Sequence, residues 1–277
     1  MSAFDYCQSL VRARDYDRFL SNLFAPADKR PHLFALHAFD SEIGNVADAV
    51  REPMAGEIRY QWWREVIAGE RAGEAASNPV AAALLEAIAQ HNLPRELLLS
   101  LIDKRGLDVL NAPPDTHATL IAYLDATSAT TIGLSLRILI GEMPVLAPAA
   151  LAAGRAVGIA KLLADFSRNA AKGRLFVPLD LLAAHGVHTR DLFAGEDSAG
   201  LRAALTELRT RALLEIGQLR SLAIPAAALP AFLPVVPVPI RLKSIVRATY
   251  DPFRTSLEVS RLRRQFAIWR AARRGSI

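Results

Sequence analysis

Acidic residues fall at four-residue intervals in the segment 34–48, with one interval empty. Asp40 and Asp48 are eight positions apart, and Gly44 stands midway between them. On a helix, residues four apart share a face, and eight residues rise about 12 Å. Two carboxylates four apart can hold a magnesium–diphosphate, because this hard cation prefers oxygen ligands. Asp40 and Asp48 alone are too far apart to chelate one ion, so solvated acids on an amphipathic helix are the competing interpretation.

A second polar face occurs in the segment 158–169. Lys161, Asp165 and Asn169 follow at four-residue steps, with Arg168 beside them, and apolar residues flank the face. A Lys and an Asp four apart form a modest surface pair, which matters more if the face is buried. The pattern therefore indicates either a surface pair or polar side chains that line a cavity.

Other chemistries lack their residues. The six histidines are scattered, and the single Cys7 offers neither a disulfide nor a zinc site. No glycine-rich phosphate loop, nucleophile elbow or Ser/His/Asp grouping is evident. Phosphate-loop nucleotide binding and serine-type hydrolysis are therefore not expected.

The elements that position these residues are predicted to be helices. Hydrophobic residues make up 52% of the chain, mostly Ala and Leu, and helical periodicity recurs almost throughout. We expect an all-α fold with one domain over residues 1–277, and only the segment 175–178 suggests a strand. The predicted helices cover 3–12, 15–23, 28–50, 54–69, 79–91, 95–110, 116–140, 147–170, 178–185, 197–221, 226–233, 240–248 and 252–273.

Positive charge is concentrated in the C-terminal segment. Residues from Arg241 onward carry a net charge of +8, and the rest of the chain carries −3. A basic helix at about 252–273 could meet anionic lipid, nucleic acid or an acidic protein, or simply face solvent. Phe253, Phe266 and Trp269 are spaced for one packed helix face rather than for stacking on bases, so nucleic acid is not expected as a partner.

The N-terminal segment contains acids and no long apolar run, so it resembles neither a secretory signal nor a transit peptide. The uncharged stretch 221–240 is about long enough to span a bilayer but contains five prolines, which argue against a spanning helix. We expect a cytoplasmic protein, with peripheral contact at the inner membrane as an option.

A series of short motifs resembles the squalene/phytoene synthase family in order and spacing, over roughly residues 10–270. The motifs are Arg18-Phe-Leu, Lys29-Arg-Pro, Phe34-Ala-Leu-His-Ala-Phe, Glu57-Ile-Arg-Tyr-Gln-Trp-Trp, Tyr123 with Ser128-Ala129, Gly158-Ile-Ala and Gly173-Arg-Leu-Phe-Val-Pro.

This resemblance implies an isoprenoid-synthase-type helical bundle around a central cavity, with two Asp-rich motifs facing each other across it. In the first motif the leading aspartate falls on Gly44 and the closing one on Asp48. In the second, Arg168 matches the arginine, but Asn169 replaces the aspartate, and the stretch up to Gly173 is about three residues short. We therefore expect magnesium affinity too weak for diphosphate ionisation.

The residues expected to line the cavity are Tyr123, Ser128, Lys161, Asp165 and Arg168. The damaged motifs are similar to those of the branch formed by respiratory complex I assembly factors. This resemblance implies a non-catalytic assembly factor without a cofactor, which binds a protein partner, a prenyl lipid or the membrane surface. The alternative is an active head-to-head prenyltransferase, in which Asp40, Glu42, Asp48 and Asp165 would replace the missing Mg²⁺ ligands. A third option is a structural protein that binds an apolar ligand.

Overall fold

Helices form all the regular secondary structure in residues 2–141 and 144–277, the part of the chain that the computed structural model describes. The expected all-α class is therefore confirmed. The segment 175–178, the strand candidate, has no regular structure there, and its Leu175 and Val177 side chains are buried in the core.

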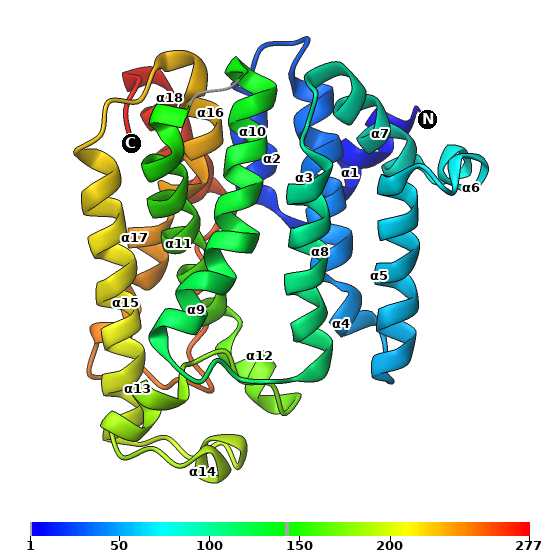
Figure 1. The fold of residues 1–277 in the computed structure, drawn as a ribbon. Coiled ribbons are helices and arrows are strands. Elements are labelled where there is room, and N and C mark those ends of the chain that lie inside the picture. The colour runs from blue at the N-terminus through cyan, green and yellow to red at the C-terminus, as the bar shows by residue number, and fades with distance from the viewer. Residues whose placement is uncertain (1, 142–143) are drawn as a thin grey trace.

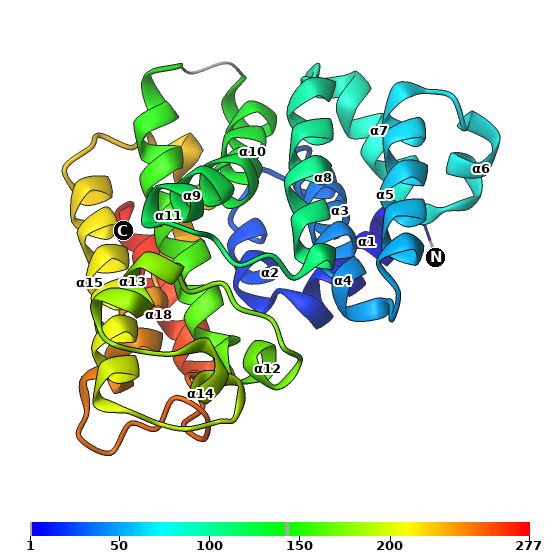
Figure 2. The same ribbon diagram turned by 60° about the horizontal axis from the view of Figure 1, so that its bottom comes forward.

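Most helices of the first half gather on one side of the molecule, and most of those of the second half gather on the other (Figure 1). The first set comprises α1 Ala3–Arg14, α2 Tyr16–Asn22, α3 Arg30–Gly44, α4 Val46–Ala49, α5 Pro53–Ala68, α6 Ala72–Ser77, α7 Pro79–His91 and α8 Arg95–Leu110. The second set comprises α9 His117–Leu124, a π-helical turn Asp125–Ala129, α10 Thr130–Ile140, α11 Ala147–Ala164, α12 Phe166–Ala171, α13 Leu179–Ala184, α14 Thr189–Phe193, α15 Ala199–Arg220, α16 Leu229–Phe232, α17 Val238–Arg241 and α18 Arg261–Arg274. The two chain ends lie on opposite sides, as Figure 2 also shows.

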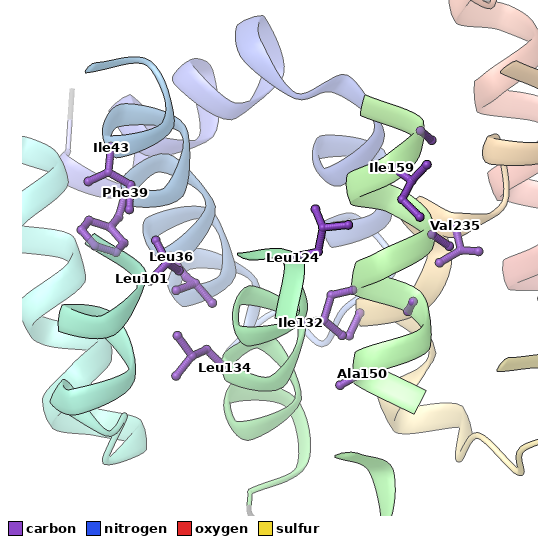
Figure 3. Close-up of a cluster of buried hydrophobic side chains, with 14 of the residues drawn as sticks. Leu36, Phe39, Ile43, Leu101, Leu124, Ile132, Leu134, Ala150, Ile159 and Val235 are labelled. Atoms are coloured by element: carbon purple, nitrogen blue, oxygen red, sulfur yellow. The ribbon is translucent and has the colours of Figure 1, made fainter. Parts of the chain in front are cut away.

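Helix α3 lies between the two halves and is buried along most of its length, from His32 to Asp40. It packs against α1, α7 and α8 of the first half and against α10 of the second. Leu36 of α3, Leu101 of α8 and Leu134 of α10 belong to one buried cluster (Figure 3). Burial of each such side chain contributes about 1.5–3 kcal/mol relative to exposure.

Two glycines of α11 allow the second half to pack closely. A Cβ on Gly154 would lie 2.3 Å from the Cα of Ala129 in the π-helical turn, and one on Gly158 would lie 2.5 Å from Cδ2 of Leu124. The backbones of α11 and the turn therefore approach to a distance that only glycine permits at position 154.

Three long helices predicted from periodicity are interrupted. The segment 28–50 breaks at Asn45, the segment 147–170 breaks at Asp165, and the segment 116–140 contains the π-helical turn. The first two breaks fall inside the two polar motifs. Both Asn and Asp favour turns, since their short side chains compete for backbone hydrogen bonds.

The basic C-terminal helix begins nine residues later than predicted, at Arg261 instead of 252. The side chain of Asp251 accepts hydrogen bonds from the backbone N–H groups of Phe253 and Arg254, which forms a turn where the helix was expected. Ser260 then caps the helix by accepting from the N–H of Arg263.

Two segments, Ala147–Ala164 and Ala226–Val246, are long and apolar enough to cross a membrane by length and composition alone. More than half of each segment is buried inside the fold (56% in both), as expected for core elements. They are therefore weak evidence for a membrane span.

Candidate functional site

Asp40 lies on α3, is 6% exposed and is paired with two guanidinium groups. Arg18 of α2 donates from Nη1 to Asp40 Oδ2, and Arg105 of α8 places Nη2 3.5 Å from Oδ1. Burial by itself would raise the pKa of Asp40, but Arg18 and Arg105 outweigh it and hold that pKa well below its usual range. Asp40 is therefore a charged, internally neutralised anion.

Arg105 extends this ionic cluster toward α9. Its Nη1 donates to the hydroxyl of Tyr123 at 2.7 Å, and that hydroxyl donates to Asp108 Oδ1 at 2.8 Å. Burial raises the pKa of Asp108 and of Tyr123, so the phenol stays protonated and acts as a donor. We call the five residues Arg18, Asp40, Arg105, Asp108 and Tyr123 the ionic cluster.

The guanidinium of Arg105 also covers the position where the first motif has lost its leading acid. A Cβ built on Gly44 would lie 3.7 Å from Cζ of Arg105, which is ordinary van der Waals contact. A fixed cation therefore stands at the motif position that the family resemblance assigns to a carboxylate, and it would repel a divalent cation.

Asp48 is paired with cations from the segment that follows the second motif. Lys172 places Nζ 2.9 Å from Oδ1 of Asp48, and Arg174 donates from Nη1 to the same oxygen. Arg174 also donates to the carbonyl of Ala47 and, from Nε, to Asn111 at 3.0 Å. Burial would raise the pKa of Asp48, but the hydrogen bonds from Lys172 and Arg174 lower it.

The two motifs therefore meet, and Lys172 and Arg174 link them directly. Asn169 lies on the same side, since its carbonyl accepts from the backbone N–H of Arg174 at 2.9 Å, and both residues line one small pocket. Asp48 therefore contacts two cations of its own chain directly at this point.

Of the predicted cavity residues, Tyr123 and Lys161 lie at or near the ionic cluster, and the others make contacts elsewhere. Lys161 is exposed, yet its positive charge lowers the pKa of Asp15 and of Asp40, which places it near this cluster. Asp165 pairs locally with the exposed Arg168 at 2.9 Å. Ser128 packs instead at the close contact between α11 and the π-helical turn, with its Oγ 3.0 Å from a Cβ placed on Gly158.

The donor set does not fit a magnesium–diphosphate. In the ranges 2–141 and 144–277, no three or more His, Cys, Asp or Glu side chains are grouped to hold a metal ion. Magnesium takes oxygen ligands and dehydrates reluctantly, so it needs free carboxylates. Asp40, Asp48 and Asp165 each already contact a Lys or Arg of this chain.

Sequence reasoning missed Arg105 and Asp108 as site residues. Both lie on the face of α8 that carries the buried Leu98, Leu101 and Ile102, at steps of three and four. Charged residues inside an apolar helical stripe are a signal of a buried ion pair, and this signal was available in the sequence.

Comparisons with known proteins address the family of the chain. The family model for squalene/phytoene synthase matches residues 11–265. The NADH dehydrogenase (ubiquinone) complex I assembly factor 6 of Homo sapiens is 31% identical over 256 residues, which cover 91% of this chain and 77% of that protein. A phytoene synthase of Thermus thermophilus is 28% identical over 207 residues, which cover 73% of this chain and 68% of that enzyme. The crystal structure of a dehydrosqualene synthase has the same fold, with a TM-score of 0.81 at 16% identity and coverage of 98% and 97%. The chain therefore belongs to the squalene/phytoene synthase family, in the branch that includes complex I assembly factor 6.

Proposed function

We propose that this chain is a non-catalytic member of its family that assists the assembly of respiratory complex I. One observation carries the proposal: Lys172 and Arg174 pair with Asp48 where the two motifs meet. The likeness to complex I assembly factor 6, along 91% of the chain, supports the assembly role.

The physical reason is the charge of a prenyl diphosphate. Its several negative charges enter an apolar cavity, and the diphosphate ionises only when carboxylates of the protein hold divalent cations against it. Gly44 and Asn169 lack the carboxylates, and Asp48 is already neutralised. The chemistry that remains is binding, through the ionic cluster and the helices around it.

The alternative is an active prenyltransferase, which the likeness to a phytoene synthase keeps open. Asp40, Glu42, Asp48 and Asp165 would then have to serve as the Mg²⁺ ligands. The pKa of Glu42 is raised by burial and responds to Arg14 and Arg59 rather than to the ionic cluster, so Glu42 belongs to another environment.

A product assay tests the enzymatic half of the proposal. Purified protein is incubated with farnesyl or geranylgeranyl diphosphate, Mg²⁺ and NADPH, and released pyrophosphate is measured. We expect no turnover in the wild type. Turnover that Asp48→Ala abolishes, while the matched surface variant Asp103→Ala retains it, would overturn the proposal.

A deletion strain tests the assembly half. We expect complex I to be reduced on native gels while the isoprenoid content of the cells stays unchanged. Full-length chain and the Asp48→Ala variant should both restore complex I, because no catalysis is needed. Normal complex I in the deletion strain would contradict the role.

We further propose that residues 1–277 act as one domain at the inner membrane, bound peripherally. Contacts of α2 with α16 and α18, and of α3 with α10, support the single domain. A prenyl lipid as ligand belongs to the same proposal and is tested by co-purification from membranes followed by mass spectrometry.

A further inference from the structure

Helix α18 exposes an apolar stripe to solvent. Leu262, Phe266 and Trp269 occur at steps of four and three, so they share one face of the helix. Their exposed fractions are 80%, 60% and 48%, and the rings of Phe266 and Trp269 lie 5.8 Å apart. Three large apolar side chains on one exposed face form a patch that a protein surface rarely leaves uncovered.

The opposite face anchors α18 to the fold. Ile268 and Ala271 are buried in the core. The carboxylate of Asp17 on α2 accepts hydrogen bonds from the guanidinium of Arg264 at 3.1 Å and from that of Arg241 at 2.8 Å. The Arg264 contact fixes the start of α18 against α2. The stripe is therefore held in a defined orientation.

Arginines border the stripe. Arg263 and Arg270, seven residues apart, are exposed along one edge, and the Arg273 guanidinium lies 5.9 Å from the centre of the Trp269 ring. An apolar face bordered by Arg side chains, with a Trp among its members, is the composition of helices that lie in the interface of an anionic bilayer.

A pocket of about 440 Å³ opens where α18 begins. Its lining includes Arg14, Arg261 and Arg264, the Tyr16 ring and one carboxylate, Glu258. The guanidinium carbons of Arg261 and Arg264 lie 5.2 and 5.4 Å from the centre of the Tyr16 ring. Within residues 2–141 and 144–277, Arg14 and Arg261 have no carboxylate within 4 Å, so both remain available to an anion.

From the stripe and the pocket together, we infer that α18 docks on anionic phospholipid. Leu262, Phe266 and Trp269 enter the acyl boundary, and the guanidiniums of Arg14 and Arg261 receive a headgroup phosphate. Guanidinium suits this role because its planar donors match two phosphate oxygens at once. The pocket adjoins the N-terminal end of the stripe, since Arg261 and Leu262 are consecutive. The inference rests on the proposed peripheral binding at the inner membrane, but this surface is separate from the ionic cluster, so its test does not depend on the assembly role.

Vesicle flotation tests the apolar part. The full chain is mixed with vesicles of phosphatidylcholine alone or of phosphatidylcholine and phosphatidylglycerol in equal parts. We expect binding only to the anionic vesicles, with roughly tenfold weaker binding for Phe266→Glu. The matched control is Leu214→Glu, on α15 and similarly exposed at 63%, which should bind as the wild type does. Equal binding of Phe266→Glu and wild type, or equal binding to neutral vesicles, would overturn the inference.

The phosphate part is tested by charge-matched double variants. Arg14→Gln with Arg261→Gln should weaken vesicle binding several-fold and make it less sensitive to salt. Arg190→Gln with Arg254→Gln removes the same charge from two side chains that are 92% and 89% exposed, and should weaken binding less. Equal loss in both double variants would show that only net charge matters and would refute the pocket's role.

Two further outcomes would also refute docking on lipid. Inorganic phosphate that binds by calorimetry, together with a Phe266→Glu variant that floats normally, would make the pocket a site for free phosphate. A wild type that ignores all vesicles, while Phe266→Glu impairs complex I assembly in cells, would make the stripe a protein interface.

Discussion

Replacing Arg105 by Met probes the ionic cluster most directly. The change removes the guanidinium that lies 3.5 Å from both Asp40 and Asp108 and that donates to the Tyr123 hydroxyl. Met fills similar space without a charge. Asp40 keeps Arg18, and Asp108 keeps the hydrogen bond from Tyr123 but loses its paired guanidinium.

The expected cost follows from burial. Asp40 and Asp108 are 6% and 7% exposed, and removing one partner of a buried ion pair costs about 3–5 kcal/mol. Since Arg18 still neutralises Asp40, we expect the lower end, about 3 kcal/mol. Burial already raises the pKa of Asp108 above its ordinary value, and without the opposing charge of Arg105 that pKa rises further. Ionisation of Asp108 then costs stability as pH rises, so the deficit should be larger at pH 8 than at pH 5.

Urea denaturation followed by circular dichroism, at both pH values, measures this loss. The control is Arg64→Met, because Arg64 pairs with Glu57 and Asp103, whose side chains are both 60% exposed, and such surface pairs contribute less than about 1 kcal/mol. The reasoning fails if Arg105→Met costs no more than Arg64→Met, or if its deficit shrinks as pH rises.

Four further substitutions have defined outcomes. Burial and the Arg18 charge lower the pKa of His37 from 6.5 to about 3, so the contribution of neutral His37 to stability is full above pH 6.5 and is lost as pH falls. Between pH 6 and 4, His37→Gln should therefore reduce the slope of unfolding free energy against pH by up to about 1.4 kcal/mol per pH unit. Urea titration at several pH values measures this slope. Gly154→Ala should cost about 1–3 kcal/mol or more, because it drives a methyl group into the backbone of the π-helical turn. In the control Gly133→Ala the new methyl group meets no atom within 4 Å, so this variant should be more stable by about 0.5–1 kcal/mol. Thermal unfolding compares the two variants, and equal effects would contradict the packing account. In Gly44→Asp the new carboxylate should pair with the guanidinium of Arg105, so the melting temperature should not depend on Mg²⁺. A melting temperature that rises with Mg²⁺ in scanning fluorimetry would contradict this and would show that one acid suffices to restore a metal site.

The amino-acid sequence was sufficient for the helical class and for the family, because both depend on local information. Helical periodicity and Ala/Leu content specify helices wherever they occur. The losses at Gly44 and Asn169 are visible in the sequence as well, since they are identities at fixed spacings. The apolar stripe of α18 follows the same periodicity, although the sequence predicted that Phe266 and Trp269 would pack, and they are exposed.

Only the tertiary structure decided what surrounds each surviving acid. Arg105 is 65 positions from Asp40, and Arg174 is 126 positions from Asp48, so no local spacing relates them. Burial then determines their state: a carboxylate and a guanidinium removed from water must find each other, and the fold selects which pairs do. For this reason the spacing of Asp40 and Asp48 suggested a weakened metal site, and their three-dimensional neighbours show a set of direct ion pairs instead.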